Sequence, residues 1–341
     1  MYSKEENKTI AELAYDDGDF KLLNAPEIFA IEGTNHCNIK CIMCPRGEPD
    51  LMRRKVGHIS QNTLESILEK ANYFSDICWL HWFGEPLMNP NVYEHIKLAK
   101  SKIPNIGIST NATLLNPQAQ RLLIDSGLDT IMIAIDGVDK ETYESVRKSQ
   151  HFTFEKVVTN AEEFLALRAE LGLLKPHVIL SMIAMDITSG QLEKFRERWE
   201  LCGANEVIFK PYTNWGGQNI DVFDNYQVKK LQNTLNHKRA HPCKFLWTSI
   251  VVSHNGDVVP CCYDYDTTMT MGNINEHSID EIWNGDKYIQ LRQAELEGRN
   301  SSVLCDNCSQ APGRLRKTTF NKAYENIKKI IYRMYRKLSL I

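Results

Sequence analysis

The segment His36–Arg46 reads HCNIKCIMCPR and places Cys37, Cys41 and Cys44 on one short stretch of the chain. It follows the β-rich run Ile28–Glu32, so the three thiols fall on a loop after a predicted strand. Three thiolates this close can hold an iron–sulfur cluster in which one iron lacks a protein ligand. Zinc is the alternative, although closed structural zinc sites favour four ligands in paired spacing and only the adjacent histidine offers a fourth.

Strand-like and helix-like patterns alternate from Pro26 to about Trp215. The strand-like runs are Ile28–Glu32, Ile77–Trp82, Asn105–Thr110, Thr130–Asp136, His177–Met185 and Glu206–Lys210. The helical segments begin after Ser60 and after Asn116, or cover Phe154–Leu171 and Ser189–Leu201. Six such units in order predict parallel strands with right-handed crossovers. The predicted fold class is α/β, an open partial (β/α)6 barrel of the TIM type, with its chemistry at the carboxyl ends of the strands.

Glycines and asparagines in TNWGGQN, residues 213–219, interrupt this alternation. We therefore predict an N-terminal extension at 1–25, the barrel at 26–220, a small cysteine-containing domain at 221–313 and a basic helix at 314–341. That last segment carries nine Lys or Arg and one Glu, with apolar residues at helical spacing. It can lie on an anionic membrane surface, dock on a partner, or pack on its own domain as any surface helix does.

Composition restricts the class of protein. The chain has 341 residues, of which 43% are hydrophobic and 24% charged, as in ordinary globular proteins. Its formal charge of -3 gives no electrostatic support for nucleic-acid binding. No apolar stretch approaches the roughly 20 residues that span a bilayer. The first residues, MYSKEENKTI, lack the apolar core of a secretory signal, so we predict a cytoplasmic protein.

Ten cysteines in a reducing compartment indicate metal or redox chemistry rather than disulfides. Cys78 and Cys202 are isolated in apolar or helical surroundings and are predicted to pack in the core. A second group consists of Cys243, Cys261, Cys305 and Cys308. Four thiolates complete the coordination of an iron–sulfur cluster, and zinc is again the alternative.

Four motifs together resemble the radical S-adenosylmethionine (SAM) enzymes over most of Ile28–Lys210. They are CNIKCIMC at 37–44, FGEP at 83–86, STNA at 109–112 and IAIDG at 133–137. In that family the open iron binds the amino and carboxylate groups of SAM, and the reduced cluster cleaves the sulfonium to a 5′-deoxyadenosyl radical. The protein then supplies chiefly binding and geometry.

The resemblance also implies cofactor-binding residues. Gly84, Glu85 and Pro86 match the motif that binds the amino group of SAM, although Phe83 replaces the usual first glycine. A side chain there makes the backbone less free to approach the ligand, so binding of the amino group is expected to depend more on the Glu85 carboxylate than on the shape of the loop.

Further along, Ser109 and Asn111 match strand-end positions that contact ribose or carboxylate in relatives, or they form a turn of small polar residues. Asp136 and Arg147 lie beyond the fourth strand. Arg147 can pair with the SAM carboxylate, or it belongs to a salt bridge on the surface of a helix at 140–148.

The second cysteine group resembles the SPASM domain, an auxiliary-cluster extension of many such enzymes. The resemblance rests on Cys243-x12-Gly256-x4-Cys261 and on the segment Met271–Arg292. Because no cysteine follows Cys308, the chain looks like the reduced form, the twitch domain. The implied cofactors are SAM and two [4Fe-4S] clusters, one SAM-binding and one auxiliary, and the implied partner is a reductant such as flavodoxin or ferredoxin.

Cys262, next to Cys261, is a packing residue, an alternative ligand, or a catalytic hydrogen-atom donor to a substrate radical. A donor is needed for epimerisation, whereas dehydrogenation would send an electron to the auxiliary cluster. Relatives with one auxiliary cluster oxidise or epimerise aminocyclitols and sugars, so we favour dehydrogenation of a small sugar or aminocyclitol. Epimerisation, radical maturation of a peptide and a non-catalytic metal-binding scaffold are the alternatives. About 25 residues precede the barrel, too few for a leader-binding module, which weakens the peptide hypothesis.

Overall fold

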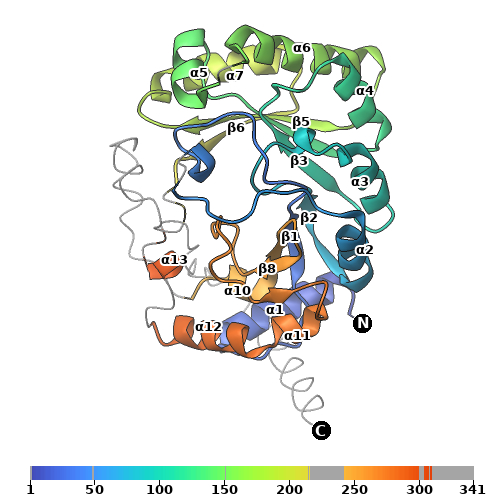
Figure 1. The fold of residues 1–341 in the computed structure, drawn as a ribbon, viewed down its shortest axis with the longest axis vertical. Helices are drawn as coiled ribbons and strands as arrows, with labels where there is room; N and C mark the ends of the chain where they lie inside the picture. The colour runs from blue at the N-terminus through green and yellow to red at the C-terminus, as the bar shows by residue number, and fades with distance from the viewer. Residues whose placement is uncertain are drawn as a thin grey trace, which may run out of the picture.

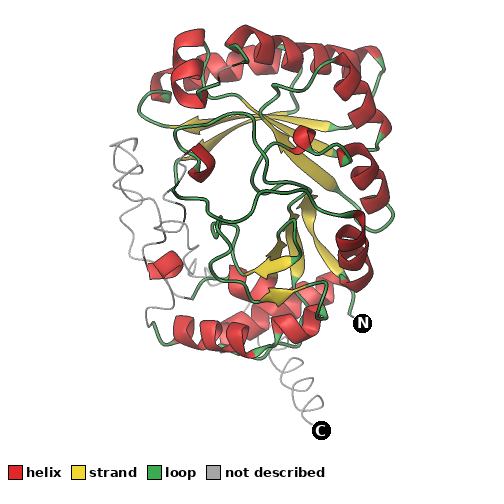
Figure 2. Ribbon diagram, viewed as in Figure 1, coloured by secondary structure: helices red, strands yellow, loops and turns green. Residues whose placement is uncertain are grey.

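The computed structural model describes residues 2–47, 50–149, 151–213, 215, 242–298, 303–306 and 308. Within these residues one sheet runs in the order β6-β5-β4-β3-β2-β1-β7-β8-β9. The strand bounds are β1 Glu27–Ile31, β2 Tyr73–Trp79, β3 Ile106–Thr110, β4 Thr130–Ala134, β5 His177–Ala184, β6 Glu206–Pro211, β7 Ser249–Val252, β8 Asp257–Val259 and β9 Gly272–Asn273. Helices line the outer side of the curved sheet (Figures 1 and 2).

The helices alternate with the first six strands as predicted. Their bounds are α1 Lys4–Asp17, α2 Gln61–Lys70, α3 Val92–Ala99, α4 Pro117–Asp125, α5 Lys140–Arg147, α6 Phe154–Glu170, α7 Leu192–Leu201, α10 Phe245–Thr248, α11 Ile279–Trp283, α12 Asp286–Leu296 and α13 Val303–Asp306. Short 3-10 turns are η1 Pro45–Gly47, η2 Pro86–Met88 and η3 Ser189–Gln191. Strands β1 to β6 pair in parallel. This confirms the α/β partial barrel.

Local signals start several of these helices. The side chains of Ser60, Asn116 and Thr153 each accept a hydrogen bond from a backbone N–H of the first turn of α2, α4 and α6. Such caps satisfy donors that the helix itself leaves unpaired. Strand β2 begins at Tyr73, four residues before the predicted run.

Beyond the barrel, strand β7 pairs in parallel with β1, and β8 and β9 continue the sheet antiparallel. The cysteine-containing C-terminal segment thus extends the barrel sheet directly. Helix α1 lies beside α10 and α12 at the end of the molecule away from α4–α7 (Figure 1). Tyr15 Oη donates to Pro242 O at 2.7 Å, and Trp247 Nε1 donates to Asp19 O at 2.6 Å.

Parts of the predicted organisation lie outside the described residues, namely the boundary at 220–221 and the basic helix at 314–341. The helices that are described include none with the length and apolar character needed to cross a membrane. Cys78 is fully buried in β2, which confirms its packing role, and Cys202 packs half-buried at the edge of the same core.

Candidate active site

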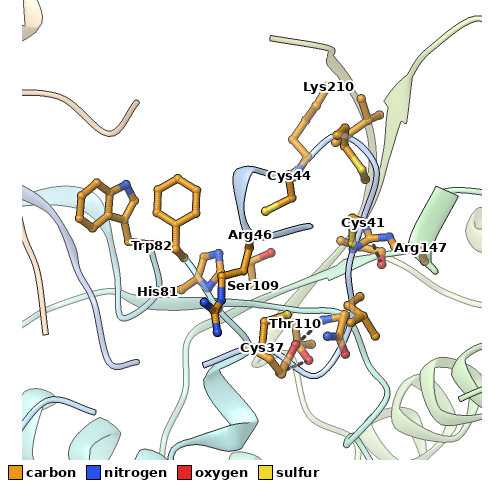
Figure 3. A pocket seen from close by; sticks show the side chains of 18 of the residues that line it. Cys37, Cys41, Cys44, Arg46, His81, Trp82, Ser109, Thr110, Arg147 and Lys210 are labelled. Atoms are coloured by element: carbon orange, nitrogen blue, oxygen red, sulfur yellow. Dashed lines mark hydrogen bonds between the residues drawn. The ribbon is translucent and has the colours of Figure 1, made fainter. Parts of the chain in front are cut away.

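The loop after β1 gathers three thiols at one cavity. Cys37, Cys41 and Cys44 all line it, and each thiol lies close enough to interact electrostatically with at least one of the others (Figure 3). Burial raises the pKa of Cys37 and of Cys44 to about 12. Buried thiols of this kind lose their protons when a metal centre binds them. The predicted loop position of the cysteine motif is confirmed.

Backbone contacts fix the shape of this loop. Ile42 N donates to Val146 O at 2.9 Å, and Cys44 N donates to Cys41 O at 3.1 Å. At Gly47 an added Cβ would lie 2.4 Å from Cys41 O, a distance that no side chain tolerates. Asn38 Nδ2 donates to Thr113 Oγ1 at 2.8 Å and so links the loop to the residues after β3. The thiols are therefore held from two neighbouring connections.

Glu85 lies buried beside the same cavity. Its carboxylate accepts hydrogen bonds from Thr110 Oγ1 and Asn111 N, both at 2.7 Å, and from Leu87 N at 3.1 Å. Burial nevertheless raises its pKa to about 7, and the three donors only partly offset this. A carboxylate in this state favours the approach of a cation.

The backbone before Glu85 requires glycine. Gly84 has φ +84°, and a Cβ there would lie 2.5 Å from His36 O. Pro86 follows and opens η2, but it does not border the cavity. Phe83, in the place of the usual glycine, is buried and does border it.

Ser109 and Asn111, at the end of β3, both border the cavity. Asn111 Oδ1 accepts from Thr113 N at 3.0 Å, and Asn111 Nδ2 donates to Asn38 Oδ1 at 3.0 Å. Asn111 thus forms the polar turn considered from sequence, and it faces the cavity as well. The two interpretations of this residue do not exclude each other.

Asp136 and Arg147 pair with one another inside the protein, so the surface salt-bridge interpretation is wrong. Arg147 Nη2 lies 2.7 Å from Asp136 Oδ2, and Nη1 lies 3.5 Å from Cys41 Sγ. Both residues are buried, because the last turn of α5 closes over the end of β4. Only Arg147 borders the cavity; Asp136 lies behind it and also accepts from Ile183 N at 2.7 Å.

The cavity, of about 170 Å³, also has lining residues that the sequence reasoning missed. They include Arg46, His81, Trp82, Lys210 and Trp215, the first four labelled in Figure 3. His81 and Lys210 belong to the predicted strand-like runs, and alternation along those runs could have indicated that their side chains face the barrel interior.

The second cysteine group gathers across the C-terminal segment. Cys261 and Cys308 lie near enough to Cys243 for their thiols to contribute to its raised pKa. Burial is the larger cause, and together these effects raise the pKa of Cys243 to about 12. Cys308 N donates to Cys305 O at 3.2 Å, which keeps the CxxC pair together. The structure thus brings Cys243, Cys261 and Cys308 near one another, and Cys305 joins them through its hydrogen bond to Cys308. Among the described residues, no three of these thiols are already arranged as the ligands of a metal.

Cys262 does not line the cavity. Its side chain packs against the cluster that contains Trp82 and Phe83, and its thiol contacts that of Cys261. Its carbonyl accepts a hydrogen bond from Trp82 Nε1 at 2.7 Å. Cys262 therefore ties the auxiliary segment to the cavity wall.

An aromatic wall formed by Trp82, Phe83, Trp215, Tyr263 and Tyr265 separates the two cysteine groups. Phe83 packs on Trp215 with ring centroids 5.3 Å apart, and Trp215 packs edge-on to Tyr263 at 6.0 Å. The thiols of Cys243, Cys261 and Cys308 in turn lie near enough to the Tyr263 hydroxyl to contribute to its raised pKa. Packed rings thus run from the barrel cavity to the second cysteine group.

Three side chains, Glu32, Arg54 and His254, form a buried clamp that connects the barrel with the C-terminal segment. The Arg54 guanidinium makes two hydrogen bonds to the Glu32 carboxylate, and His254 Nδ1 lies 3.0 Å from Glu32 Oε2. Arg54 Nε donates to Tyr265 O at 2.6 Å, and its guanidinium stacks 4.7 Å from the Trp82 ring. Although burial opposes ionisation, Arg54 and His254 hold the pKa of Glu32 below its ordinary value.

These residues fit an iron–sulfur cluster with SAM. Thiols are the ligands of such clusters, and here three border a cavity that also holds a buried carboxylate and a guanidinium. Carboxylate and guanidinium complement the ammonium and carboxylate ends of an amino acid. The second group offers four thiols, as a fully ligated auxiliary cluster requires.

Comparison with protein families gives two matches. Residues 31–174 match the Radical SAM superfamily, and residues 243–309 match SPASM, an iron–sulfur cluster-binding domain. Both matches contain the cysteine groups described above.

Two curated relatives match along most of their length. The tungsten-containing aldehyde ferredoxin oxidoreductase cofactor-modifying protein of Pyrococcus furiosus is 22% identical over 77% of this chain and 82% of its own. The S-adenosyl-L-methionine-dependent 2-deoxy-scyllo-inosamine dehydrogenase of Niallia circulans is 23% identical over 82% of this chain and 91% of its own.

Solved structures share the fold. BtrN in complex with AdoMet and 2-DOIA superposes with a TM-score of 0.53 at 22% identity, over 83% of this chain and 92% of that one. Streptococcus suis SuiB bound to the precursor peptide SuiA gives 0.60 at 16% identity, over 85% of this chain and 71% of that one. The Radical SAM match implies SAM and a [4Fe-4S] cluster, and the SPASM match implies auxiliary iron–sulfur. The chain belongs to the radical SAM enzymes that carry a SPASM iron–sulfur domain.

Proposed function

We propose that this radical SAM enzyme removes hydrogen from a small polar substrate, a sugar or an aminocyclitol, and leaves it dehydrogenated. The observation that carries the proposal is the similarity to a dehydrogenase of an aminocyclitol across 91% of that protein. The fold similarity to BtrN is consistent with it. Bound SAM and the reduced cluster would supply the hydrogen-abstracting agent, and the auxiliary cluster would supply a one-electron acceptor.

The residues of the chain divide into roles. Cys37, Cys41 and Cys44 hold the first cluster at the cavity. Glu85 binds the SAM ammonium, and its buried position makes the ion pair strong because little water competes. Gly84 and Pro86 give its loop the required shape.

Arg147 orients the SAM carboxylate, and Asp136 acts through Arg147 by fixing its guanidinium. Ser109 and Asn111 offer hydroxyl and amide groups to the remaining polar atoms of SAM. We therefore assign Asp136 a positioning role in place of direct cofactor contact.

The second group, Cys243, Cys261, Cys305 and Cys308, holds one auxiliary cluster. The packed rings of the aromatic wall connect this group with the cavity wall. The proposed domain division stays at 26–220 and 221–313, with a flavodoxin or ferredoxin as reductant. Because thiols stay reduced in the cytosol and this chain has ten cysteines, the cytoplasm is the proposed location.

Dehydrogenation is favoured over epimerisation by the place of Cys262. A hydrogen-atom donor must reach the substrate, whereas Cys262 packs behind Trp82 and does not line the cavity. The test is turnover of candidate sugars and aminocyclitols by the reconstituted enzyme in deuterated water. A ketone or aldehyde without solvent deuterium at the reacting carbon supports dehydrogenation. An epimer with one solvent deuterium on carbon would overturn it.

Peptide maturation is the second candidate, because SuiB, solved with its precursor peptide, shares the fold over 85% of this chain. The two candidates differ in substrate size. The rate of 5′-deoxyadenosine formation distinguishes them. A rate that increases when a short peptide encoded by a neighbouring gene is added, and does not change when sugars are added, would favour peptide maturation.

A further inference from the structure

Two polar side chains face the cavity without a part in the proposed cofactor site. His81 follows β2, and Lys210 lies on β6. Nδ1 of His81 is buried and lacks a hydrogen-bond partner among the residues that are described. Among the described residues, Lys210 Nζ makes one hydrogen bond, to Met132 Sδ at 3.6 Å. Both side chains are partly buried, and polar atoms removed from water are nearly always satisfied, so both indicate a ligand.

The two groups border the same cavity, His81 from the end of β2 and Lys210 from β6. His81 senses the charge of Lys210, and burial lowers the pKa of His81 to about 4, which leaves a neutral ring that can donate or accept. Burial also lowers the pKa of Lys210. A cation in such a place needs an anionic partner to offset the loss of water.

Of the other cations at the cavity, Arg147 already faces an anion, because it pairs with Asp136 and touches Cys41. Arg46 lies in η1 beside the expected cluster, and its Nε is buried without a hydrogen-bond partner among the described residues. Lys210 has no salt bridge in the described part of the chain, and the charge of Asp136 only partly offsets the effect of burial on its pKa. It also lies on β6, at the far end of the strand order from β1, whose loop carries the cluster cysteines.

We propose that Lys210 and His81 form a subsite for an anionic group of the substrate, a phosphate or a carboxylate. The inference rests on the proposed function, in which a small polar molecule enters this cavity, and it narrows the substrate to an acidic sugar. The ammonium of Lys210 makes a charge-assisted hydrogen bond to the anion, and the His81 ring donates a second. An aminocyclitol would instead bring its ammonium against that of Lys210, which is unfavourable.

The test measures binding by calorimetry to the reconstituted, SAM-loaded enzyme. The probes are glucose, glucosamine, glucose 6-phosphate and glucuronate, which share a ring and differ in charge. We expect one or both anionic probes to bind at least about tenfold more tightly than glucosamine. Preference for glucose 6-phosphate or for glucuronate then identifies the anion as phosphate or carboxylate.

Variants test the residues. Lys210→Met should lower the affinity for the preferred anion by about 10-fold to 100-fold, which is the loss expected for a hydrogen bond to a charged group. Lys210→Arg, the matched control, keeps the charge and should retain most of the affinity. His81→Phe should lower the affinity for the anion by less than Lys210→Met does. His81→Gln, which keeps a hydrogen-bond donor, should lower it less than His81→Phe.

Several results would overturn the subsite. They are equal binding of all four probes, no binding of either anion, undiminished binding by Lys210→Met, or a larger loss of SAM affinity than of anion affinity. Since the measurement involves no turnover, an incorrect reaction type would appear only in product analysis. The failure of this inference is thus distinct from the failure of the proposed dehydrogenation.

Discussion

The two cysteine groups reach their positions in different ways. Cys37, Cys41 and Cys44 occupy one loop, whose own backbone bonds and the turn at Gly47 shape it. The auxiliary group draws on residues from Cys243 to Cys308, which lie on both sides of the strand β7 that pairs with β1. The first site is therefore largely local, whereas the second depends on contacts between distant residues, which cost more chain entropy.

This contrast predicts separable losses, and the largest follows Cys41→Ala. We expect no measurable 5′-deoxyadenosine formation, because the first cluster loses a ligand, while the auxiliary cluster still loads. Iron analysis should fall from about eight to about four per chain. Cys202→Ala, at a half-buried cysteine outside both groups, is the matched control and should keep full activity. Normal cleavage by the Cys41 variant would refute the assignment of the first site.

Cys261→Ala should give the complementary result. Because its thiol belongs to the second group, the protein should lose product formation and about four irons, yet still cleave SAM without coupling to substrate. Iron and sulfide analysis with separate assays of 5′-deoxyadenosine and product checks this. Twelve irons in the wild-type protein, or zinc without sulfide at Cys305 and Cys308, would contradict a single auxiliary cluster.

Arg54→Met should loosen the connection between the two regions. Removing one partner of a buried ion pair costs about 3–5 kcal/mol, here because Glu32 loses both of its Arg54 hydrogen bonds. Thermal unfolding should show a lower transition temperature. The pKa of Glu32 lies below its ordinary value in the folded protein, so its stabilisation is present above the unfolded pKa and is lost as the pH falls. The free energy of unfolding of the variant should therefore lack this dependence on acid pH. The same free energy of unfolding as the wild type at every pH would show that the clamp contributes little to stability.

Glu85→Gln probes the first region alone, with a smaller effect. We expect SAM affinity to fall about 10-fold to 100-fold, because the amide cannot pair with an ammonium. Since burial raises the pKa of Glu85 to about 7, wild-type affinity should rise with pH through about 7 as the carboxylate ionises. The variant should show no such rise. Parallel pH profiles for the two proteins would remove Glu85 from the SAM site.

Cys262→Ala should have the smallest effect. Its side chain packs beside the aromatic wall and away from the cavity, so both 5′-deoxyadenosine and product should change by less than about twofold. Accumulation of a stalled substrate radical, seen by electron paramagnetic resonance, would instead identify Cys262 as the hydrogen-atom donor.

Much of the architecture is local enough to be predicted. The cysteine spacing at 37–44, the caps at Ser60 and Asn116, and the six alternating units each depend on residues near in sequence. Capping hydrogen bonds between residues three apart, and the periodicity of apolar side chains, both arise within one segment of the chain. They can therefore be recognised in the sequence without knowledge of the tertiary structure. These signals were sufficient to predict the barrel and the loop that carries Cys37, Cys41 and Cys44.

The sequence alone therefore determined the first six strands, their parallel order and the seven candidate cluster ligands. Only the tertiary structure showed that β7, β8 and β9 continue the same sheet, and which polar groups meet: Asp136 with Arg147, and Glu32 with His254 across 222 positions. It also decided that Cys262 lies behind the cavity wall. The reason is physical. Such contacts depend on strand curvature, register and close packing, which are set by the whole core and leave no periodic trace in the chain.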